Sequence, residues 1–591
     1  MTTSLVDADS LLAVDIGSIT TRAMLFDVVD GRYRFVAAGS APSTAGAPFL
    51  DVGEGVRKAI DRLQSVTGRT LVDSQDHLII PTGRDGTGVD SFAATISAGA
   101  PIKVVAVGLL EGISLESAHR LAQTTYTKVA ESISLNDHRK PEARIDTILR
   151  LRPDLILIAG GTDDGAEHSM LRLLESVGLA CYLMPKEQRP VLFFTGNQEL
   201  HDEVEARLGE LAHTEFAPNV RPAIEMEQID PAHIKLQRLY SDIRKRQVHG
   251  VRELDEWANG NLMPTAAAFG RLVRFLSKKY TSQKGVLGVD VGASAASILA
   301  GFADALAVGV YPDLGLGAGL PDMLDGTLGK KEQKTIENIL RWLPQSASAE
   351  TLQEYIYNKS LFPGSVPGNE EELAIEEAIT REILREAIRR VSYQFPDKAR
   401  SPGLGLLPWF EPIIASGSVL TNSPTHAHSL LMLLDGLQPS GVTTMVLDQH
   451  HLAPALGVAA GINPLLTVQV LDSNAFLYLG TVISPVGNAR PGTPVLRVKM
   501  TTDAGRENAL DVKRGSLEVL PLPFGQTARM QLQPLHRFDV GMGGPGRGGK
   551  LRVHGGVLGV IIDARGRPLK LPEDVARRQE LLKKWIWMLG S

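Results

Sequence analysis

The sequence is poor in cysteine, because its 591 residues include only Cys181, in the apolar run GLACYLMP. A single thiol cannot form a disulfide within the chain. It also cannot supply the several thiolates of structural zinc sites or iron–sulfur clusters. A lone cysteine among apolar neighbours is typical of a small buried residue. We therefore expect Cys181 to be a core residue and look for function elsewhere.

The sequence also lacks a hydrophobic run long enough to cross a membrane. The longest weakly charged stretch, residues 285–310, is rich in Gly and Ala and contains Asp290 and Asp304. A spanning helix needs about 20 consecutive apolar residues. The start, MTTSLVDADSLLAVDIG, has no basic segment ahead of its apolar residues, unlike a secretory signal. These absences predict a cytoplasmic protein without a membrane span.

No excess of positive charge is present either. The chain carries 61 Lys and Arg residues against 67 Asp and Glu residues, which gives a formal net charge of -6. Proteins that hold nucleic acid through its phosphate backbone carry a basic surface. Nucleic acid is therefore not an expected partner.

What the sequence does contain is a regular alternation of short apolar runs and helical patterns. Runs such as LLAVDIGS (11–18), DLILIAGG (154–161) and GVLGVDVGAS (285–294) end in glycine turns. Helical segments, such as the one at 371–395, separate these runs. This order is typical of α/β proteins with largely parallel sheets. We interpret the many charges of the helix at 371–395 as a solvated face.

Composition divides the chain into five parts. Helical patterns without a clear strand fill residues 216–280, and beyond residue 463 the chain changes to short β-branched runs separated by Gly and Pro. That change predicts a small antiparallel barrel or sandwich that is closed by a helix, folds on its own and mediates association. In the alternative interpretation, the closing helix packs on the lobes of the same chain. The predicted parts are a disordered tail (1–10), a first α/β lobe (11–215), a helical connection (216–280), a second α/β lobe (281–463) and a β-rich C-terminal domain (464–591).

The segment LLAVDIGSITTRAML carries the clearest chemical motif. An apolar strand delivers Asp15 to a turn that contains Gly17, Ser18 and Thr20, and the chain then continues as a second strand. Backbone N–H groups and hydroxyls in such a hairpin can bind phosphate, and a carboxylate at a strand end can hold hydrated Mg²⁺. In the alternative interpretation, the short pattern is a plain Asp-Gly hairpin.

The same arrangement occurs a second time, which favours the chemical interpretation. In GVLGVDVGASAASILAG, the corresponding places are occupied by Asp290, Gly292 and Ser294. Two such hairpins facing each other can hold a nucleoside triphosphate, and the turn at Gly417 and Ser418 in EPIIASGSVLTNSP suits its adenosine. These three elements in this order are similar to the phosphate-one, phosphate-two and adenosine motifs of the actin, Hsp70 and sugar-kinase superfamily.

This resemblance implies ATP and Mg²⁺ as cofactors, with Asp15 at the metal and Asp15 and Asp290 as the catalytic candidates. A further strand-end turn, LILIAGGTDDG, places Gly160 and Gly161 ahead of the paired carboxylates of Asp163 and Asp164 and suits a cofactor, a metal or a ribose. In the alternative interpretation, this turn is a strand–helix loop whose Asp residues cap the next helix.

Ten segments in succession resemble one family in particular. They are DIGSITTRAMLFD, KVVAVGL, DLILIAGGTDDG, FFTGN, FAPNVRP, LMPTAAAF, GVDVGAS, YPDLGLGAGLP, ASGSVLT and LDQHHLAPALGVAAGI, and they cover roughly residues 11–463. This succession is similar to the accessory proteins, called MutL or GlmL, that are encoded beside adenosylcobalamin-dependent glutamate mutase. The resemblance implies a two-lobed, actin-like ATPase (ribonuclease H-like) α/β fold with the C-terminal β-rich domain appended.

The resemblance also implies a function. By analogy with diol dehydratase reactivases, such a protein exchanges damaged cobalamin or acts as a chaperone for the mutase. Its expected partners are the mutase subunits and further copies of itself, and its expected enzymatic activity is at most a slow ATPase. His450 and His451 are not followed by the glycine of the corrinoid-binding DxHxxG pattern, so we expect structural histidines there.

The sequence departs from the family pattern at the second hairpin. The usual DVGGATTD reads DVGASAAS here, so that Ala295 and Ala296 replace hydroxyl residues and Ser297 replaces an acid. Ser418 also stands where the adenosine turn usually has glycine. Loss of one charge-stabilising group can lower a rate by about 10² to 10³. The alternative function is therefore a non-hydrolysing, nucleotide-binding scaffold that recruits a partner through its C-terminal domain. A small-molecule kinase is the weakest interpretation, because no carboxylate is placed as its base.

Overall fold

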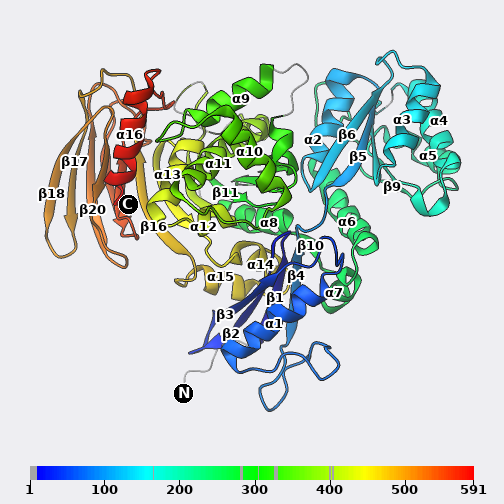
Figure 1. The fold of residues 1–591 in the computed structure, drawn as a ribbon, viewed down its shortest axis with the longest axis horizontal. Helices are drawn as coiled ribbons and strands as arrows, with labels where there is room; N and C mark the ends of the chain where they lie inside the picture. Colours follow the sequence, from blue (N-terminus) through cyan, green and yellow to red (C-terminus); the bar gives the residue numbers. More distant parts are fainter. Residues whose placement is uncertain are drawn as a thin grey trace.

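The computed structural model describes residues 9–163, 165–279, 284–303, 305–324, 330–397, 399, 401, 403 and 405–590. Residues 1–8 of the expected tail at 1–10 lie outside these ranges. Four sheets form the frame of the molecule (Figure 1). They belong to a first lobe, a domain inserted into that lobe, a second lobe and a C-terminal sandwich that shares a sheet with the second lobe.

The sheet of the first lobe has the strand order β3-β2-β1-β4-β10. The first three strands form an antiparallel meander, whereas β4 and β10 run parallel to β1. The amphipathic helix α1 (Gly53–Thr67) packs on β2 and β3. The strands are β1 (Leu11–Ile16), β2 (Thr20–Val29), β3 (Arg32–Pro42), β4 (Ser91–Ile96) and β10 (Met263–Pro264).

The second lobe repeats this topology strand for strand. Its sheet begins with the order β13-β12-β11-β14-β15, again with an antiparallel meander followed by parallel strands. Alternate residues of β11 face two separate hydrophobic clusters. One cluster contains residues of helix α8 (Thr265–Ser277), and the other contains residues of helix α11 (Glu370–Val391). The strands are β11 (Gly285–Val291), β12 (Ala296–Phe302), β13 (Ala305–Tyr311), β14 (Phe410–Ser416) and β15 (Gly441–Leu447).

A separate parallel sheet is inserted between β4 and β10, within the part expected to be one lobe. Its order is β6-β5-β7-β8-β9, and all five strands are parallel. Figure 1 shows this inserted domain as the cyan body beside the two lobes. Its elements are β5 (Ile102–Gly108), α2 (Glu116–Ala122), β6 (Thr127–Ser134), α3 (Pro141–Leu151), β7 (Leu155–Ala159), α4 (Glu167–Leu183), β8 (Val191–Phe194), α5 (His201–Leu208) and β9 (Thr214–Phe216).

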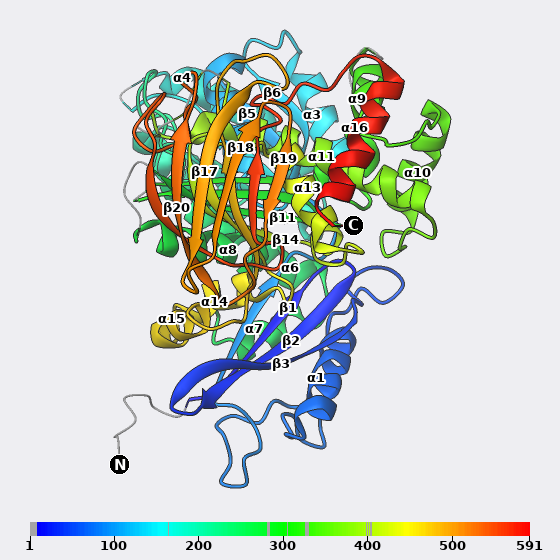
Figure 2. The same cartoon turned by 90° about the vertical axis from the view of Figure 1, so that its left-hand side faces the viewer.

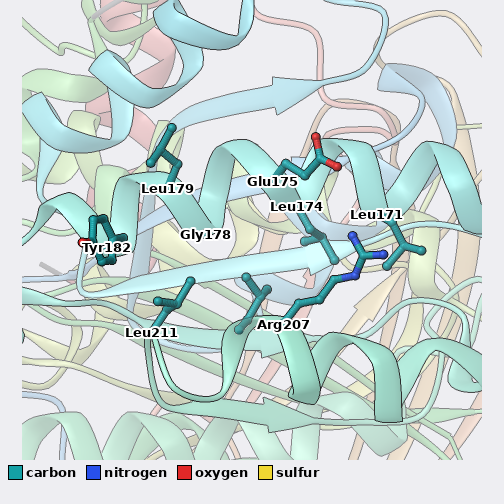
Figure 3. Close-up of a pocket in the computed structure, with 9 residues that line it drawn as sticks. Leu171, Leu174, Glu175, Gly178, Leu179, Tyr182, Arg207 and Leu211 are labelled. Carbon is teal, nitrogen blue, oxygen red and sulfur yellow. The ribbon is translucent and has the colours of Figure 1, made fainter.

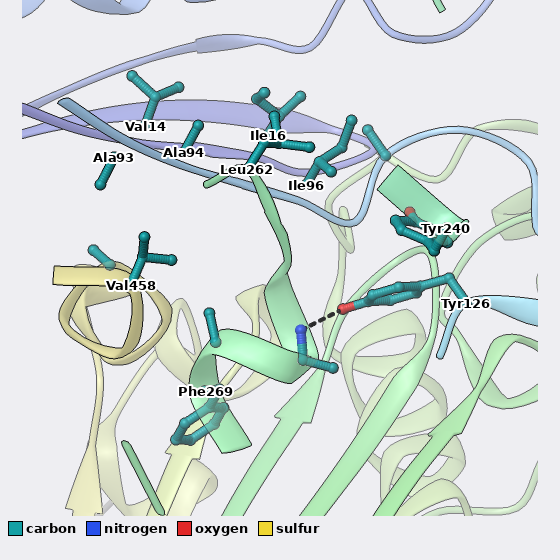
Figure 4. Close-up of a cluster of buried hydrophobic side chains, with 14 of the residues drawn as sticks. Val14, Ile16, Ala93, Ala94, Ile96, Tyr126, Tyr240, Leu262, Phe269 and Val458 are labelled. Carbon is teal, nitrogen blue, oxygen red and sulfur yellow. Dashed lines mark hydrogen bonds between the residues drawn. The ribbon is translucent and has the colours of Figure 1, made fainter. Parts of the chain in front are cut away.

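Three helices and the two-residue strand β10 connect the inserted domain to the second lobe. These helices are α6 (Asp230–Gln247), α7 (Val251–Trp257) and α8 (Thr265–Ser277). Helix α8 packs against α14 (Leu452–Ala459) of the second lobe. Figure 4 shows Val458 of α14, Phe269 of α8 and Ala94 of β4 in the same buried cluster, so one core joins the two lobes.

The C-terminal region extends the sheet of the second lobe, which therefore crosses the domain boundary expected at residue 464. Strands β16 (Leu477–Ser484), β22 (Val560–Asp563) and β19 (Leu517–Leu520) follow β15 in that sheet. A four-stranded antiparallel sheet shares a hydrophobic cluster with them and completes a sandwich (Figure 2). Its strands are β18 (Glu507–Lys513), β17 (Pro494–Thr502), β20 (Thr527–Pro534) and β21 (Gly549–His554).

The remaining helices cover the second lobe and its extension. Helix α15 contacts β3 of the first lobe, and α16 contacts α13 and β19, with Trp585 buried and Trp587 exposed. These helices are α9 (Lys330–Leu340), α10 (Ala349–Leu361), α11 (Glu370–Val391), α12 (Ser418–Thr421), α13 (His426–Gly436), α15 (Pro464–Leu471) and α16 (Val575–Met588).

The charged side chains in the middle of α11 are buried, so the interpretation of a solvated face is wrong there and holds only toward the two ends of the helix. Glu376, Glu377 and Arg381 are all less than 10% exposed. Each is paired, with Lys359 Nζ lying 2.7 Å from Glu376 and Arg381 Nε lying 3.0 Å from Asp435. Buried charges are tolerated when they are paired in this way.

Among the described residues, no helix combines the length and the apolar character that a membrane crossing requires.

Candidate functional site

The two predicted hairpins have the same construction. In the first lobe, Asp15 lies at the end of β1, between Arg22 on β2 and Thr95 on β4. In the second lobe, Asp290 lies at the end of β11 between Ser297 on β12 and Ser416 on β14. Because the strand order is also the same, the two acids occupy equivalent positions in a duplicated fold.

The hairpin turns also match. The N–H of Gly17 donates to the carbonyl of Thr20 at 3.1 Å, and the N–H of Gly292 donates to the carbonyl of Ala295 at 3.1 Å. A side chain at Gly17 would lie 2.8 Å from the Thr20 carbonyl oxygen, so this turn requires glycine. Ser18 and Ser294 lie at the tips and are partly exposed. Their hydroxyls and the neighbouring N–H groups are the groups that a phosphate binds.

Asp15 is buried and accepts hydrogen bonds from two hydroxyls, one on strand β4 and one at the start of helix α8. Thr95 Oγ1 donates to its Oδ1 at 2.7 Å, and Thr265 Oγ1, at the start of α8, donates to the same atom at 2.9 Å. Burial raises the pKa of Asp15, and these hydrogen bonds together with Arg22 oppose the rise. The carboxylate is therefore oriented before any ligand arrives.

Arg22 links the hairpins electrostatically. Its guanidinium interacts with Asp15 on its own lobe and with Asp290 and Asp448 on the second lobe. Three carboxylates thus lie within electrostatic range of one cation at the junction of the lobes, without an ion pair to it among the described residues. Burial, with repulsion from the other two acids, raises the pKa of Asp290 to about 7, and mainly burial raises that of Asp448 to about 6.

Asp290 has an unused coordination position. Part of the residue is exposed, but its Oδ1 atom is buried and has no hydrogen-bond partner. In Asp448, in contrast, both carboxylate oxygens have partners. They accept hydrogen bonds from the N–H groups of Leu452 and Ala453 at 2.8 Å, so that Asp448 caps the start of α14. Asp290 therefore has a buried oxygen without a hydrogen-bond partner among the described residues.

The turn predicted to contact adenosine lies beside the second hairpin. Gly417 has a φ of +100°, and a side chain there would lie 2.2 Å from the carbonyl oxygen of Val291 at the end of β11. Ser418 begins the short helix α12. Next to this turn, Ser416 Oγ lies 3.2 Å from His451 Nδ1. The turn and the hairpin therefore form one continuous strand-end surface.

Gly160 and Gly161 do not join this group. They follow β7 in the inserted domain, where the side-chain amide of Asn219 donates to the Gly161 carbonyl at 3.0 Å and to Asp163 at 2.9 Å. A side chain at Gly161 would lie 3.1 Å from Cβ of Asn197. Packing between loops of the inserted domain accounts for both glycines. Asp163 ties two of these loops together. Among the described residues no side chain caps the start of α4, and Asp164, the other predicted acid of this turn, lies outside them.

Four residues of the junction were not among the predicted site residues: Arg22, Thr95, Thr265 and Asp448. Asp448 follows the apolar run MVL, which is the strand-end pattern that singled out Asp15 and Asp290. Arg22 lies within the quoted first motif. Thr95 and Thr265 carry no sequence signal, because only the pairing of β1 with β4 and the start of α8 bring them to Asp15.

The donor set suits a hydrated Mg²⁺ ion that arrives with phosphate, rather than a metal caged by protein. In the part of the chain that the structure describes, no group of three or more His, Cys, Asp and Glu side chains is arranged to hold a metal ion. Mg²⁺ usually keeps several waters and takes one or two carboxylates together with substrate phosphates. Asp15 and the free oxygen of Asp290 provide such a pair.

The duplicated strand order, with a strand-end acid on each central strand, defines an actin-like, two-lobed fold of the ATPase type. More specifically, the chain belongs to the MutL protein family, whose model matches residues 11–475. A curated relative, protein MutL of Clostridium tetanomorphum, is 24% identical over 220 residues. That match covers 36% of this chain and 45% of the relative, so the chain spans less than half the length of this relative.

Solved structures with a similar arrangement include component A of the (R)-2-hydroxyglutaryl-CoA dehydratase of Acidaminococcus fermentans, at 10% identity and a TM-score of 0.26. The match covers 76% of this chain and 96% of that one. The ethanolamine utilization protein EutJ of Carboxydothermus hydrogenoformans matches at 10% identity and a TM-score of 0.26, over 77% of this chain and 90% of its own. At such scores, the fold assignment depends on the strand order described above.

Proposed function

We propose that this chain is a cytoplasmic, nucleotide-dependent accessory protein that reactivates an adenosylcobalamin-dependent mutase such as glutamate mutase. Membership in the MutL family supports the mutase as the partner. The observation that carries the nucleotide dependence is the meeting of Asp15, Asp290 and Arg22 between two equivalent hairpins. The hairpins, the Gly417 turn and the free oxygen of Asp290 support ATP with Mg²⁺ as the ligand.

The chain's own residues would act on the nucleotide in a simple way. The hairpin N–H groups and hydroxyls bind the phosphates, Asp15 and Asp290 hold the hydrated metal, and Arg22 neutralises phosphate charge. The metal, when bound, neutralises charge on the phosphate oxygens. Asp15 and Asp448 are buried at the junction, so nucleotide entry requires the lobes to move apart. This opening would couple the nucleotide state to the binding of a partner.

Thermal melting tests the nucleotide site directly. We expect Mg-ATP to raise the melting temperature of the wild type, because a ligand of the folded state stabilises it by RT ln(1 + [L]/Kd). Asp15→Asn should abolish the shift, whereas Asp61→Asn, on the exposed face of α1, should keep it. An unchanged melting curve at millimolar Mg-ATP would remove the basis for the proposal.

The mutase part of the proposal needs a separate experiment. Purified glutamate mutase inactivated with damaged cobalamin should recover turnover when this protein, ATP and fresh adenosylcobalamin are added together. Omission of ATP or use of the Asp15→Asn variant should prevent recovery. Nucleotide binding without any recovery, and without a complex in sedimentation, would contradict the accessory role.

One observation favours the second candidate, a nucleotide-binding scaffold without hydrolysis. Ser297, which stands where the family usually has an acid, lies directly opposite Asp290, and its hydroxyl is buried without a partner. Ala295 and Ala296 beside it are buried and offer no hydroxyl. If Ala295→Thr with Ser297→Asp restores ATP turnover, the missing groups limit hydrolysis. If the double variant binds nucleotide with unaltered turnover, those groups do not limit it.

A further inference from the structure

Four large apolar side chains are exposed at the end of α10 and in the loop that follows it. Tyr357, Leu361, Phe362 and Val366 are exposed by 54%, 72%, 67% and 83%. Tyr357 and Leu361 lie one helical turn apart on the same side of α10. Apolar side chains that gather on a surface in this way mark an interaction site. We call these four residues the α10 patch.

The loop of the α10 patch is held by contacts on two sides. Lys359 Nζ donates to the carbonyl of Ser365 at 2.6 Å and lies 2.7 Å from Glu376 Oε2. On the other side, a side chain at Gly364 would lie 3.3 Å from Cγ2 of Ile19 in the first hairpin. Figure 2 shows α10 at the edge of the molecule, above the first lobe. Because these contacts fix the loop, a partner that binds there loses little affinity to ordering it.

The exposed charges that border the α10 patch in the sequence are acidic. Glu350 and Glu354 precede it on α10, and Glu370 and Glu371 follow it at the start of α11. All four are exposed, and none makes an ion pair with a residue that the structure describes. Glu354 lies beyond the first turn of α10, where an acid no longer stabilises the helix start. Between residues 342 and 380 the one basic residue is Lys359, which is buried.

Basic side chains of the neighbouring helices lie elsewhere. Helix α10 contacts α9 and α11. A separate cavity, which no residue of the patch lines, is lined by Lys334 of α9 and by Arg385 and Arg389 of α11. Arg341, which follows α9, lies close enough to Arg578 of α16 to help lower its pKa. The surface around the patch therefore attracts a basic partner and repels anionic membranes and nucleic acid.

A second apolar surface lies between α4 and α5 of the inserted domain, but its charges are mixed. This groove encloses a cavity of 360 Å³ with a largely leucine lining. Figure 3 shows Glu175 on α4 and Arg207 on α5 at its border, with Leu179 and Tyr182 toward one end. Because both signs of charge are present, the groove does not select a partner by charge. It provides a comparison surface for the α10 patch.

We propose that the α10 patch is a docking surface, and that its occupant is an amphipathic helix of a partner protein whose apolar stripe is flanked by lysine or arginine. Such a helix buries its apolar residues against the patch. Its cations meet the acids on both sides. The patch contains no residue of the lobe junction, so the proposal goes beyond the proposed function and does not require nucleotide binding.

A second copy of this chain is a poorer match for the patch. Its α16 has an exposed aromatic residue, Trp587, at the end of a charged face. That face carries Glu580 between Arg577 and Lys584, so its charges are of both signs. An occupant with cations alone around its apolar stripe complements the acidic border better.

Fluorescence anisotropy with the full chain and two labelled peptides tests the proposal. Each peptide has about 18 residues, long enough to form a helix, with a stripe of leucine and charged positions that are all lysine or all glutamate. The lysine peptide should bind and the glutamate peptide should not. Leu361→Ser with Phe362→Ser should raise the Kd of the lysine peptide at least about tenfold. Leu179→Ser in the groove between α4 and α5 is the matched control and should leave it unchanged.

Charge reversal tests the acidic border by itself. Glu354→Lys with Glu371→Lys should weaken binding of the lysine peptide at least about tenfold and should let the glutamate peptide bind. Glu142→Lys with Glu187→Lys, at exposed positions of the inserted domain, makes the same change in net charge and should alter neither affinity at physiological salt. Circular dichroism should show that all variants are folded.

Three results would overturn the proposal. The first is a lysine peptide that does not bind, or that binds no better than the glutamate peptide. The second is binding that persists in the Leu361→Ser and Phe362→Ser double variant, or that is lost with Leu179→Ser. The third is self-association of the wild type, measured by sedimentation, that this double variant abolishes, since the occupant would then be a second copy.

Discussion

At the residue scale, three acids lie near one arginine at the lobe junction. As a result, the carboxyl group of Asp290 is harder to ionise than that of a free aspartate. Folding raises the pKa of Asp290 from its usual value of 3.8 to about 7, because burial and the neighbouring acids disfavour its charge. The folded state therefore holds this proton more tightly than the unfolded state does. The free energy of unfolding should fall as the pH rises from about 4 to about 7 and should level off above that range.

Asp290→Asn should remove this penalty. We expect the variant to be more stable than the wild type at pH 8, by about 1 to 4 kcal/mol, with little difference at pH 4, where both side chains are neutral. Urea unfolding at the two pH values measures this. Asp61→Asn, on the exposed surface, is the control and should leave the pH profile unchanged. A variant that is less stable than the wild type at pH 8 would show that the charge of Asp290 is favourable in the folded protein.

The same pKa predicts how binding should depend on pH. Metal ligands must be deprotonated, and Asp290 ionises in the protein only near pH 7. The affinity for Mg-ATP should therefore rise between pH 6 and pH 8, by up to about tenfold per pH unit below the pKa. Calorimetric titration across this range, with ATP in EDTA as the reference, tests it. Asp290→Asn should flatten the profile, and a flat wild-type profile would place the metal away from Asp290.

At the element scale, the crossing of α8 and α14 joins the two lobes. Gly457 of α14 lies so close to α8 that a side chain there would come within 1.8 Å of the carbonyl oxygen of Ala268. This contact is with backbone, which cannot rotate away as a side chain can. The crossing therefore requires glycine at this position, although glycine is unfavourable within a helix.

Gly457→Ala should force the helices apart. We expect a loss of about 1 to 3 kcal/mol in the free energy of unfolding, despite the better helix propensity of alanine. Gly461→Ala is a suitable control, because its nearest atoms are the flexible end of Arg271 and the Val458 carbonyl, at 3.0 and 3.4 Å. Urea unfolding of both variants measures the effect. Equal stability of Gly457→Ala and the wild type would mean that the lobes adjust freely at this crossing.

At the scale of the whole molecule, buried ion pairs attach the C-terminal region to the second lobe. Arg565 contacts Asp435 of α13 at 2.8 Å and Asp563 of β22 at 2.9 Å, and all three side chains are fully buried. The guanidinium also lies over the ring of Trp585, 4.5 Å from its centroid. Arg565 and Arg567 hold the pKa of Asp563 well below its usual range against the effect of burial. We therefore expect the C-terminal region to unfold together with the second lobe.

Removal of this cation should destabilise the whole unit. Arg565→Met leaves two buried carboxylates without their shared partner and should cost about 3 to 5 kcal/mol. Arg497→Met is the matched control, since Arg497 pairs with Asp511 at 2.8 Å on an exposed strand and should cost less than about 1 kcal/mol. Calorimetry should show one transition for the wild type. Two separate transitions, with only one sensitive to Arg565→Met, would support an independent C-terminal domain.

Much of the fold was predictable because it depends on local patterns. Strand-end acids at Asp15 and Asp290, each followed by a glycine turn, predicted two equivalent hairpins, and the resemblance to a known family predicted the lobes that carry them. The inserted domain was not separated from the first lobe, because its strands alternate with helices in the same way as their neighbours. The change in composition predicts a domain boundary at residue 464. The structure shows instead that β16, β19 and β22 belong to the sheet of the second lobe.

The sequence by itself determined the class of fold, the two hairpins and their family, since strand ends, turns and helix periodicity are properties of adjacent residues. Only the tertiary structure decided which distant groups meet. Thr265 reaches Asp15 across 250 positions of the chain, and Arg565 reaches Asp435 across 130. Likewise, the buried charges in the middle of α11 are paired rather than solvated. Pairings of this kind depend on how sheets and helices pack in three dimensions, so the pattern of neighbouring residues in the sequence does not predict them.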